Sequence, residues 1–326
     1  MNKKAVIAIL GLGAVLSLLL TPFAGDSLDY SAIFSFDSSK VDYSIFFEIR
    51  LPRVILAFLA GASLSVCGMC FQSLFRNDLA TPFTLGVASG ASFGVVLYMF
   101  AGVPLLISSF LSGTSIAAFA GAVLALGIVY GLVKFKRNVK LGDILLGGIA
   151  VNFFFTSLIL ILQFHSQGER LRSMLIWMIG GIQIMGYEQI HFILLFVILG
   201  FIIIFKNLFE MDILLSGEET AASRGVNVRK VRKELFVAVS LIVGAVVSVC
   251  GPIGFIGLMG PHICRRFVGS GHKTLFWASL LFGGIFLLLS DTLARTVLYP
   301  TDLPVGLITS AVGGPFFFWL IMNDKN

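Results

Sequence analysis

Long apolar runs separated by short polar segments follow one another along almost the whole chain. About 20 consecutive apolar residues cross a bilayer as a helix, and on that rule the pattern predicts ten transmembrane spans. Their expected bounds are 5–23, 52–75, 83–103, 115–133, 142–163, 190–206, 234–250, 252–264, 275–294 and 305–322. The eighth run is short and rich in glycine and proline. A further short helix is expected near 171–183, between the fifth and sixth spans.

The composition agrees with an all-α polytopic membrane protein. Of the 326 residues, 57% are hydrophobic and 12% are charged, whereas soluble domains carry about 25% charged residues. No polar stretch is long enough for a soluble domain, so one transmembrane domain over 1–326 is predicted. The N-terminus is similar to a signal peptide, but its apolar run from Ala5 to Leu20 is long and no A-x-A site follows. An uncleaved first span is expected instead.

The distribution of cations tests this count of spans. Ten spans place both termini on one side, and a cytoplasmic location assigns 17 of the 23 Lys and Arg residues to inside segments. The positive-inside rule predicts such a bias, and omitting the eighth span weakens it. The net charge of +6 is therefore interpreted as a signal of topology, and no nucleic-acid partner is expected.

A short internal repeat indicates an inverted architecture. The segments GASLSVCG (61–68) and GAVVSVCG (244–251) agree at six of eight positions. The first lies in the second span and the other in the seventh, so the two cross the membrane in opposite directions. Inverted repeats of this kind are common in transporters.

One polar segment, LLSGEETAASRGV, stands out in the loop between the sixth and seventh spans. Ser216 and Glu219 fit the S-x-x-E capping box, and Glu218 and Glu219 fall in the first turn, where the helix dipole favours anions. Gly225 is a natural stop for this helix of about eight residues.

A second short helix is expected at 227–233, with Asn227 as its cap. Helices this short are not stable alone in water, so the polar segment must pack against the protein or a partner. The whole loop, about 207–233, lies on the cytoplasmic side in the predicted topology.

The cysteines and histidines do not form a recognisable metal or redox site. Cys67 and Cys70 form a C-x-x-C motif, but it lies inside an apolar run, where free cysteine packs as a small hydrophobe. His262 and Cys264 have no second pair of ligands beside them. No metal site, catalytic residue or cofactor is assigned.

Two function classes remain open at this point: an ion-coupled secondary carrier, and a transporter whose energy comes from a separate subunit. An ion-coupled secondary carrier keeps ionisable groups near the bilayer centre, and Asp291 is the one credible acid there, four residues before Arg295, with which it can pair. The chain has no H-E-x-x-H, G-x-S-x-G or P-loop motif, so no enzymatic activity is expected. Energy for uphill transport would then enter from another subunit.

Four segments together resemble one family, the permease subunits of bacterial ABC importers for iron–siderophores, haem and cobalamin. The resemblance covers nearly the whole chain and rests on four segments in the expected order: RLPRVILAFLAGASLSVCGMCFQSLFRNDLATPFTLGVASGASFG (50–94), LLSGEETAASRGV (214–226), GPIGFIGLMGPHICRR (251–266) and DLPVGLITSAVGGPFFFWLI (302–321).

The resemblance implies a type II ABC importer permease fold and a homodimer in the bacterial cytoplasmic (inner) membrane. It implies two cytoplasmic ATP-binding subunits and an external substrate-binding protein as partners, beside membrane lipid. ATP hydrolysis is expected on the separate subunit. Siderophore complexes, haem and cobalamin stay open as cargo, with an iron complex favoured.

The resemblance also implies roles for three groups of residues. Three arginines are expected to dock the binding protein: Arg50, Arg53 and Arg295. Anchoring at the membrane interface would also explain them. The polar segment is expected to couple the chain to the ATPase, through Ser216, Gly217, Glu218, Glu219, Ala222 and Gly225. The substrate path is placed at Lys140, Leu141, Gly142, Asn152 and Trp177, although anchoring at the membrane interface would explain Trp177 equally well.

Overall fold

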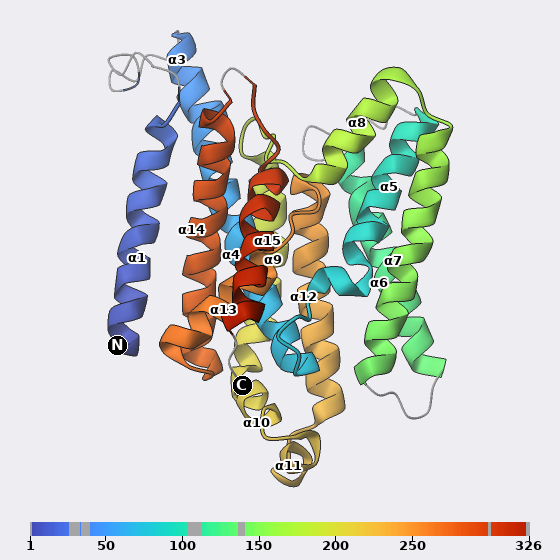
Figure 1. The fold of residues 1–326 in the computed structure, drawn as a ribbon, viewed down its shortest axis with the longest axis vertical. Coiled ribbons are helices and arrows are strands. Elements are labelled where there is room, and N and C mark those ends of the chain that lie inside the picture. Colours follow the sequence, from blue (N-terminus) through green and yellow to red (C-terminus); the bar gives the residue numbers. More distant parts are fainter. Residues whose placement is uncertain are drawn as a thin grey trace.

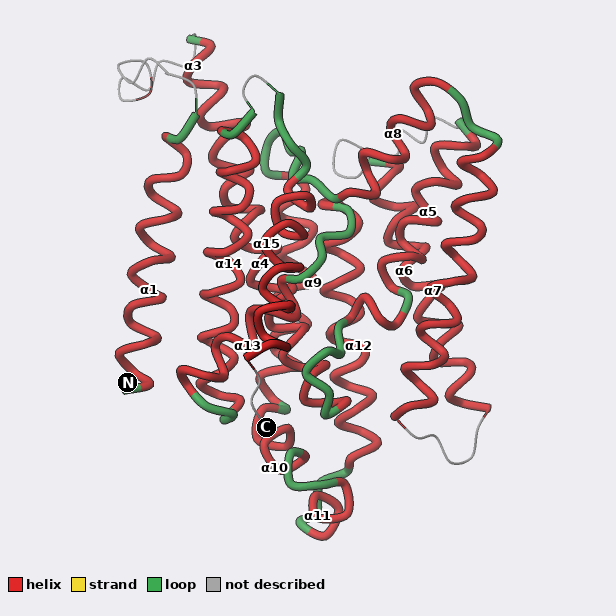
Figure 2. The backbone as a smooth tube through the Cα atoms, viewed as in Figure 1, coloured by secondary structure: helices red, strands yellow, loops and turns green. Residues whose placement is uncertain are grey.

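The computed structural model describes residues 2–25, 33, 40–102, 112–135, 141–298 and 301–323. Long helices stand side by side in one bundle (Figure 1), and the described chain consists of helices and loops (Figure 2). The main helices are α1 (Lys3–Leu20), α4 (Leu51–Phe75), α5 (Val87–Ala101), α6 (Gly113–Phe135), α7 (Leu141–Phe164), α9 (Glu188–Lys206), α12 (Val228–Cys250), α13 (Ile256–Val268), α14 (His272–Thr296) and α15 (Val305–Asn323).

Shorter elements join these helices and cover their ends. They are η1 (Thr21–Phe23), α3 (Val41–Ser44), η2 (Ile45–Arg50), η3 (Pro82–Leu85), α8 (Gly168–Ile179), α10 (Leu208–Leu214) and α11 (Glu218–Ser223). The helix expected near 171–183 is confirmed as α8. The π-helical element η2 continues directly into α4.

Every predicted span coincides with a helix, but not every helix is long enough to establish a crossing. Within the described residues, six helical segments are long and apolar enough to cross a membrane: Lys3–Phe23, Val41–Phe75, Gly142–Phe164, Glu188–Lys206, Val228–Cys250 and His272–Thr296. The helices α5, α6 and α15 contain shorter apolar stretches. The 13 residues of α13 extend about 20 Å, less than the hydrocarbon core of about 30 Å. The total of ten spans therefore stays a prediction.

Two predicted boundaries are wrong for local reasons. The third span begins at Val87, because a 3-10 turn at Pro82–Leu85 ends at Gly86 with φ +80°. The expected short helix at 227–233 is not separate: Asn227 caps α12 itself, by accepting from the Lys230 N–H at 3.1 Å. Asn227 is thus a cap as predicted, but of the seventh span.

Glycines let α4 pack against its neighbours with backbones in contact. A Cβ added at Gly68 would lie 1.8 Å from the carbonyl oxygen of Gly257 in α13, and one at Gly61 would lie 2.2 Å from that of Gly283 in α14. Small residues at such positions allow the close approach that drives helix association in membranes. α4 is therefore the buried centre of the bundle.

The two ends of the bundle differ (Figure 1). The helices α10 and α11 project from one end, where α1 begins and α15 finishes, while α3 and α8 lie at the opposite end. We call these the α11 end and the α8 end. α4 runs toward the α11 end and α12 away from it, as the inverted repeat of 61–68 and 244–251 requires.

Candidate functional site

The three predicted docking arginines all lie at the α8 end. Arg50 closes η2, and its Nη1 donates to the carbonyl oxygens of Pro22 at 3.3 Å and Ala24 at 3.5 Å. Arg295, near the end of α14, donates from Nη2 to the carbonyl of Thr21 at 3.1 Å. Both guanidinium groups therefore hold the turn that follows α1.

Arg53 and Arg295 also meet at a buried carboxylate. Asp291 is 0% exposed, and Arg53 Nε lies 3.1 Å from each of its two oxygens. Arg295 Nε lies 3.5 Å from Oδ2, so the expected pairing of Asp291 with Arg295 is confirmed. Arg53 Nη1 donates to Asp302 at 2.6 Å. We call these four residues the arginine–aspartate cluster.

The cluster joins three parts of the chain: α4, α14 and the segment before α15. A buried carboxylate is stable only when it is paired and hydrogen bonded, and two arginines meet that need here. Asp302 differs because its side chain is 53% exposed. The bond between Arg53 and Asp302 is therefore the part of the cluster that another carboxylate can reach from solvent.

At the α11 end, the start of α11 differs from the prediction. Its N-cap is Gly217 with φ +121°, and no side chain caps the helix, so the capping role of Ser216 is wrong. The Ser216 N–H instead bonds the carbonyl of Ile213 and continues the last turn of α10. The chain can turn here because glycine tolerates the positive φ. Glu218 and Glu219 do lie in the first turn, as predicted.

The end of α11 is as predicted, although the helix has six residues rather than about eight. Gly225 has φ +83°, and its N–H bonds the carbonyl of Ala222 at 3.0 Å. The N–H of Val226 reaches back to the carbonyl of Ala221, also at 3.0 Å. Together these two bonds form a Schellman motif.

One side of α11 is attached to the protein and the other faces solvent. Ala221 is fully buried, and Glu218 forms an ion pair with Arg232 of α12. Glu219, Ala222 and the residues up to Gly225 are exposed. The segment therefore presents a preformed polar surface that the bundle does not cover.

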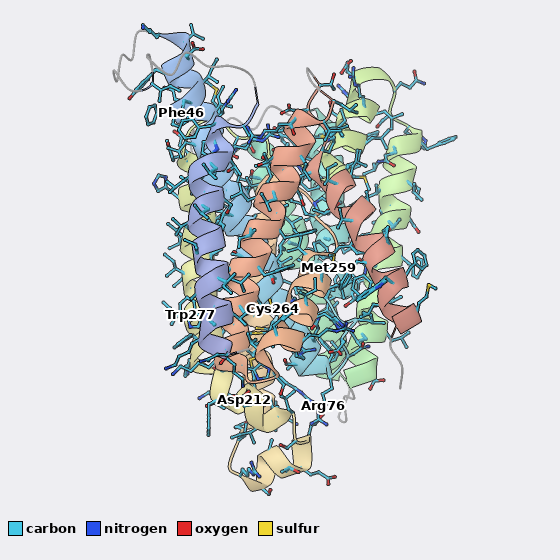
Figure 3. The ribbon with its side chains drawn as sticks, turned by 60° about the vertical axis from the view of Figure 1, so that its left-hand side comes forward. Phe46, Arg76, Asp212, Met259, Cys264 and Trp277 are labelled. Atoms are coloured by element: carbon cyan, nitrogen blue, oxygen red, sulfur yellow. The ribbon has the colours of Figure 1, made fainter. Side chains whose placement is uncertain are left out.

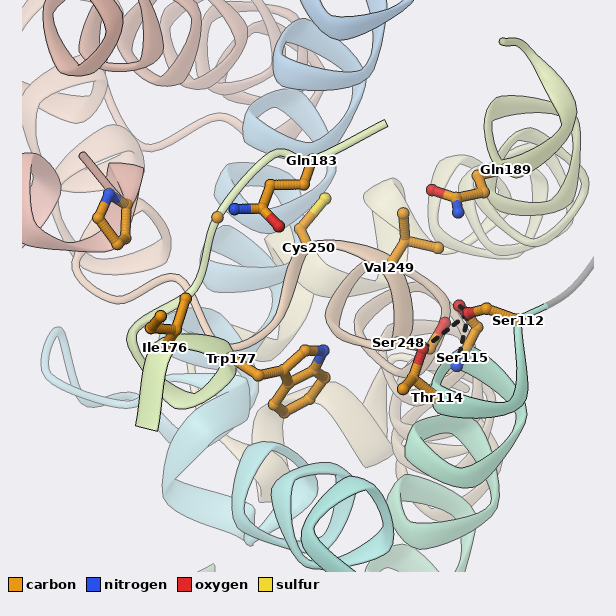
Figure 4. Close-up of a pocket in the computed structure, with 12 residues that line it drawn as sticks. Ser112, Thr114, Ser115, Ile176, Trp177, Gln183, Gln189, Ser248, Val249 and Cys250 are labelled. Atoms are coloured by element: carbon orange, nitrogen blue, oxygen red, sulfur yellow. Dashed lines mark hydrogen bonds between the residues drawn. The ribbon is translucent and has the colours of Figure 1, made fainter. Parts of the chain in front are cut away.

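A polar pocket of about 170 Å³ lies between α6, α8, α9 and the end of α12 (Figure 4). Trp177 of α8 lines it, as do the hydroxyls of Ser115 and Ser248 and the amides of Gln183 and Gln189. The described residues that line it are all uncharged. Gln189 Oε1 is buried and has no hydrogen-bond partner in the part of the chain described here. The pocket can thus bind a ligand through neutral hydrogen bonds and one aromatic face.

The other predicted path residues do not gather at this pocket. Asn152 donates to the carbonyl of Phe83 at 3.0 Å and accepts from Ser89 at 2.7 Å, so it fastens α7 to η3 and α5. Gly142 lies at the start of α7, toward the α11 end. Lys140 lies outside the described residues, and of Leu141 only the backbone is described.

Cys67 and Cys70 are free thiols, both fully buried in α4. Among the described residues, no three His, Cys, Asp or Glu side chains are grouped closely enough to hold a metal ion. The C-x-x-C motif therefore belongs to the packed centre of the bundle.

Sequence reasoning missed the main partner of Asp291. Arg53 is 238 positions away in sequence, and no local spacing connects the two. It likewise missed Asp302 and the hydroxyl and amide wall of the pocket, because isolated serines and glutamines in apolar chains carry no motif.

Comparisons with known proteins show which family this chain resembles in sequence and in fold. The model of the FecCD transport family matches residues 9–323. The hemin transport system permease protein HmuU of Yersinia pestis is 35% identical over 92% of this chain and 89% of its own length. The iron(3+)-hydroxamate import system permease protein FhuG of Bacillus subtilis is 37% identical over 86% and 84%. A metal-chelate type ABC transporter, solved in an inward-facing conformation, superposes with a TM-score of 0.86 at 27% identity and covers 99% of this chain and 100% of its own.

Proposed function

The chain belongs to the FecCD transport family of ABC-type permeases, and from this premise we propose that it is the membrane subunit of an ATP-driven importer. Its cargo is an iron complex, either a siderophore or haem, or alternatively cobalamin, and the cargo moves into the cytoplasm. The observation that carries the proposal is the exposed polar helix α11, which projects from an otherwise apolar bundle.

We assign α11 as the contact with a cytoplasmic ATPase subunit. The contact surface comprises Ser216, Gly217, Glu218, Glu219, Ala222 and Gly225. Its support is the uncovered side of the helix, whose fixed ends and ion pair to α12 hold it in place before any partner binds. A homodimer in the bacterial inner membrane, with all termini in the cytoplasm, would present two such helices to two ATPase subunits.

The α8 end is the proposed docking surface for an external binding protein, through Arg50, Arg53 and Arg295. Because Arg53 Nη1 is held by the half-exposed Asp302, an incoming carboxylate would replace Asp302 at that nitrogen. Charged pairs at the rim of an interface mainly steer association and fix orientation. Docking would then loosen the segment that leads into α15.

The polar pocket is the proposed point of contact with the cargo, and Trp177 its aromatic surface. Sites for drug-sized ligands usually measure about 300–1,000 Å³, whereas this pocket measures about 170 Å³. One protomer therefore supplies part of a wall, which fits a path shared by two copies of the chain.

The alternative, an ion-coupled secondary carrier, would need an acid that gains and loses a proton or ion during transport. Asp291 is the acid that the sequence offers for this role. It is fully buried and bound by Arg53 and Arg295, so its charge is already balanced. The described residues favour the importer.

Reconstitution with its ATPase and binding protein tests the proposal. In proteoliposomes, uptake of a ferric siderophore, haem or cobalamin should require ATP and the binding protein. The double variant Glu218→Gln/Glu219→Gln should lose co-purification of the ATPase and ATP-dependent uptake while still inserting. Glu169→Gln, an exposed glutamate of α8, is the matched control at the opposite end. Wild-type uptake and co-purification in the double variant would show that α11 is not the coupling element.

The docking surface has its own test. Asp302→Asn should raise the affinity for the binding protein, because a neutral amide binds Arg53 Nη1 less strongly than a carboxylate and is more easily replaced, and Arg50→Gln should lower it. Affinity is best measured at low salt, where electrostatic attraction is strongest. If neither variant changes the affinity, these arginines serve only the fold.

A further inference from the structure

The short helix α10 is fastened to the start of α14 by one carboxylate. Asp212 Oδ1 accepts a hydrogen bond from the backbone N–H of His272 at 2.9 Å and lies 2.6 Å from Nδ1 of the same residue. His272 is the first residue of α14, and the N-cap position, Gly271, has no side chain to cap it. An anion is favourable at this end of a helix. Asp212 thus caps α14 from a different helix.

The imidazole of His272 extends this connection to α4. Its Nε2 lies 2.6 Å from Ser73 Oγ. With the Nδ1 proton donated to Asp212, Nε2 is left as the acceptor for the Ser73 hydroxyl, so every polar atom of the ring is satisfied. His272 is 1% exposed and Ser73 6%, which shields the bond between them from competing water, whereas the side chain of Asp212 is 41% exposed. The chain Asp212–His272–Ser73 therefore joins α10, α14 and α4.

A second bond fixes the other end of α10. Arg76, which ends α4 in a left-handed conformation with φ +47°, donates from Nη2 to the carbonyl of Leu214 at 2.8 Å. Leu214 is the last residue of α10, where a cation is favourable because helix carbonyls are unpaired. Figure 3 labels Arg76 and Asp212, which both lie at the α11 end of the bundle.

The same residue types in this order form the triad of serine hydrolases, so a nucleophilic role has to be weighed. Ser73 lies within α4, whose backbone N–H groups are already used by the helix and cannot form an oxyanion hole. Its side chain is buried among other helices. This arrangement holds helices together and offers no place for a substrate.

We propose that Asp212, His272, Ser73 and Arg76 form a strut that transmits displacement of α11 to α4 and α14. α10 directly precedes α11 in the chain, and it is held at two points by buried or partly buried bonds. The two receiving helices carry the arginine–aspartate cluster at their opposite ends, so the strut connects the ATPase surface with the docking surface. The inference rests on the proposed function of α11. These four are positioning residues.

Transport per ATP hydrolysed is the measurement that tests the strut. His272→Leu should keep ATPase binding and hydrolysis near wild-type level but lower cargo transported per ATP by about tenfold, within the range of coupling between distant sites. His272→Asn, whose amide can still donate to Asp212, should restore most of it. Lys273→Ala, the exposed next residue, is the control and should change nothing.

A spin-label distance between Ser223→Cys in α11 and Ser270→Cys before α14 tests the strut without any partner. The four native cysteines are buried, so the labels attach at the two introduced sites. The distance distribution should be narrow in the wild type and in His272→Asn, and broad in His272→Leu. Where His272→Leu does not fold, Ser73→Ala removes a single oxygen and should broaden it in part.

A narrow distribution in both His272→Leu and Ser73→Ala overturns the strut, as does wild-type transport per ATP in the folded His272→Leu protein. Failure of the proposed function is a separate result. In that case the wild type neither binds the ATPase through α11 nor transports, while the spin-label distances still decide whether the strut exists.

Discussion

Replacing Gly68 by alanine should destabilise the protein, although alanine is the better helix former. The added Cβ would lie 1.8 Å from the carbonyl oxygen of Gly257 and 2.6 Å from its Cα. Carbon contacts prefer about 3.5–4.0 Å, so α4 and α13 would have to separate locally. Both obstructing atoms belong to the backbone, and no rotamer change can move them away.

The loss of stability caused by Gly68→Ala is the difference between two opposing effects. Overpacking a close-packed interior costs about 1–3 kcal/mol, and the clash with backbone places Gly68 at the upper part of that range. Alanine in place of glycine in a helix interior returns about 1 kcal/mol. The net loss is about 2 kcal/mol. For a chain of 326 residues, with an unfolding entropy of about 2.1 cal/mol/K per residue, this corresponds to a fall in Tm of about 3 °C.

Thermal unfolding in detergent, followed with a thiol-reactive fluorophore, suits this protein because its four cysteines are free and buried. Gly11→Ala in α1 is the matched control: no atom lies within 4 Å of its added Cβ, so only the gain in helix propensity acts and Tm should stay level or rise. A Tm of Gly68→Ala at or above that of the wild type would refute the close contact between α4 and α13.

Three further changes have defined outcomes. Asp291→Asn removes the carboxylate that two largely buried arginines share, of which Arg53 still keeps Asp302; breaking a buried ion pair costs about 3–5 kcal/mol, and an unchanged melting temperature would contradict the cluster. Asn227→Ala removes the cap of α12 and should cost about 0.5–2 kcal/mol, whereas Ser216→Ala should be neutral, and equal effects in thermal unfolding would argue against the assigned caps. The double variant Cys67→Ala/Cys70→Ala should retain ATP-dependent uptake in proteoliposomes at permissive temperature; complete loss in a well-inserted protein would restore a chemical role for the C-x-x-C motif.

The helices were predictable from the sequence because apolar runs of sufficient length have few alternatives in a membrane. The stop of α11 at Gly225 and the cap at Asn227 were also predictable, since both depend on local backbone chemistry. The cap at Ser216 was not, because Gly217 could take a positive φ and the chain turned one residue later. A local motif shows that a residue can cap a helix, but it does not show whether a neighbouring residue occupies the N-cap position instead.

Contacts between distant segments could not be predicted from the sequence, for a different reason. The pairing of Asp291 with Arg295 follows from helical spacing, whereas its pairing with Arg53 depends on how α4 and α14 pack. The contact of His272 with Ser73 has the same origin. A single sequence carries the residue types for these clusters but no measure of which distant residues meet.

The arginine–aspartate cluster also sets an order of events during synthesis. Arg53 leaves the ribosome 238 residues before its carboxylate partner. At about 5–20 residues per second, that interval is roughly 12–48 s. Throughout it, the α8 end of α4 must keep its guanidinium in the headgroup region or in water. The α8 end of the bundle can close only when Asp291 arrives, so its assembly waits for the last tenth or so of the chain.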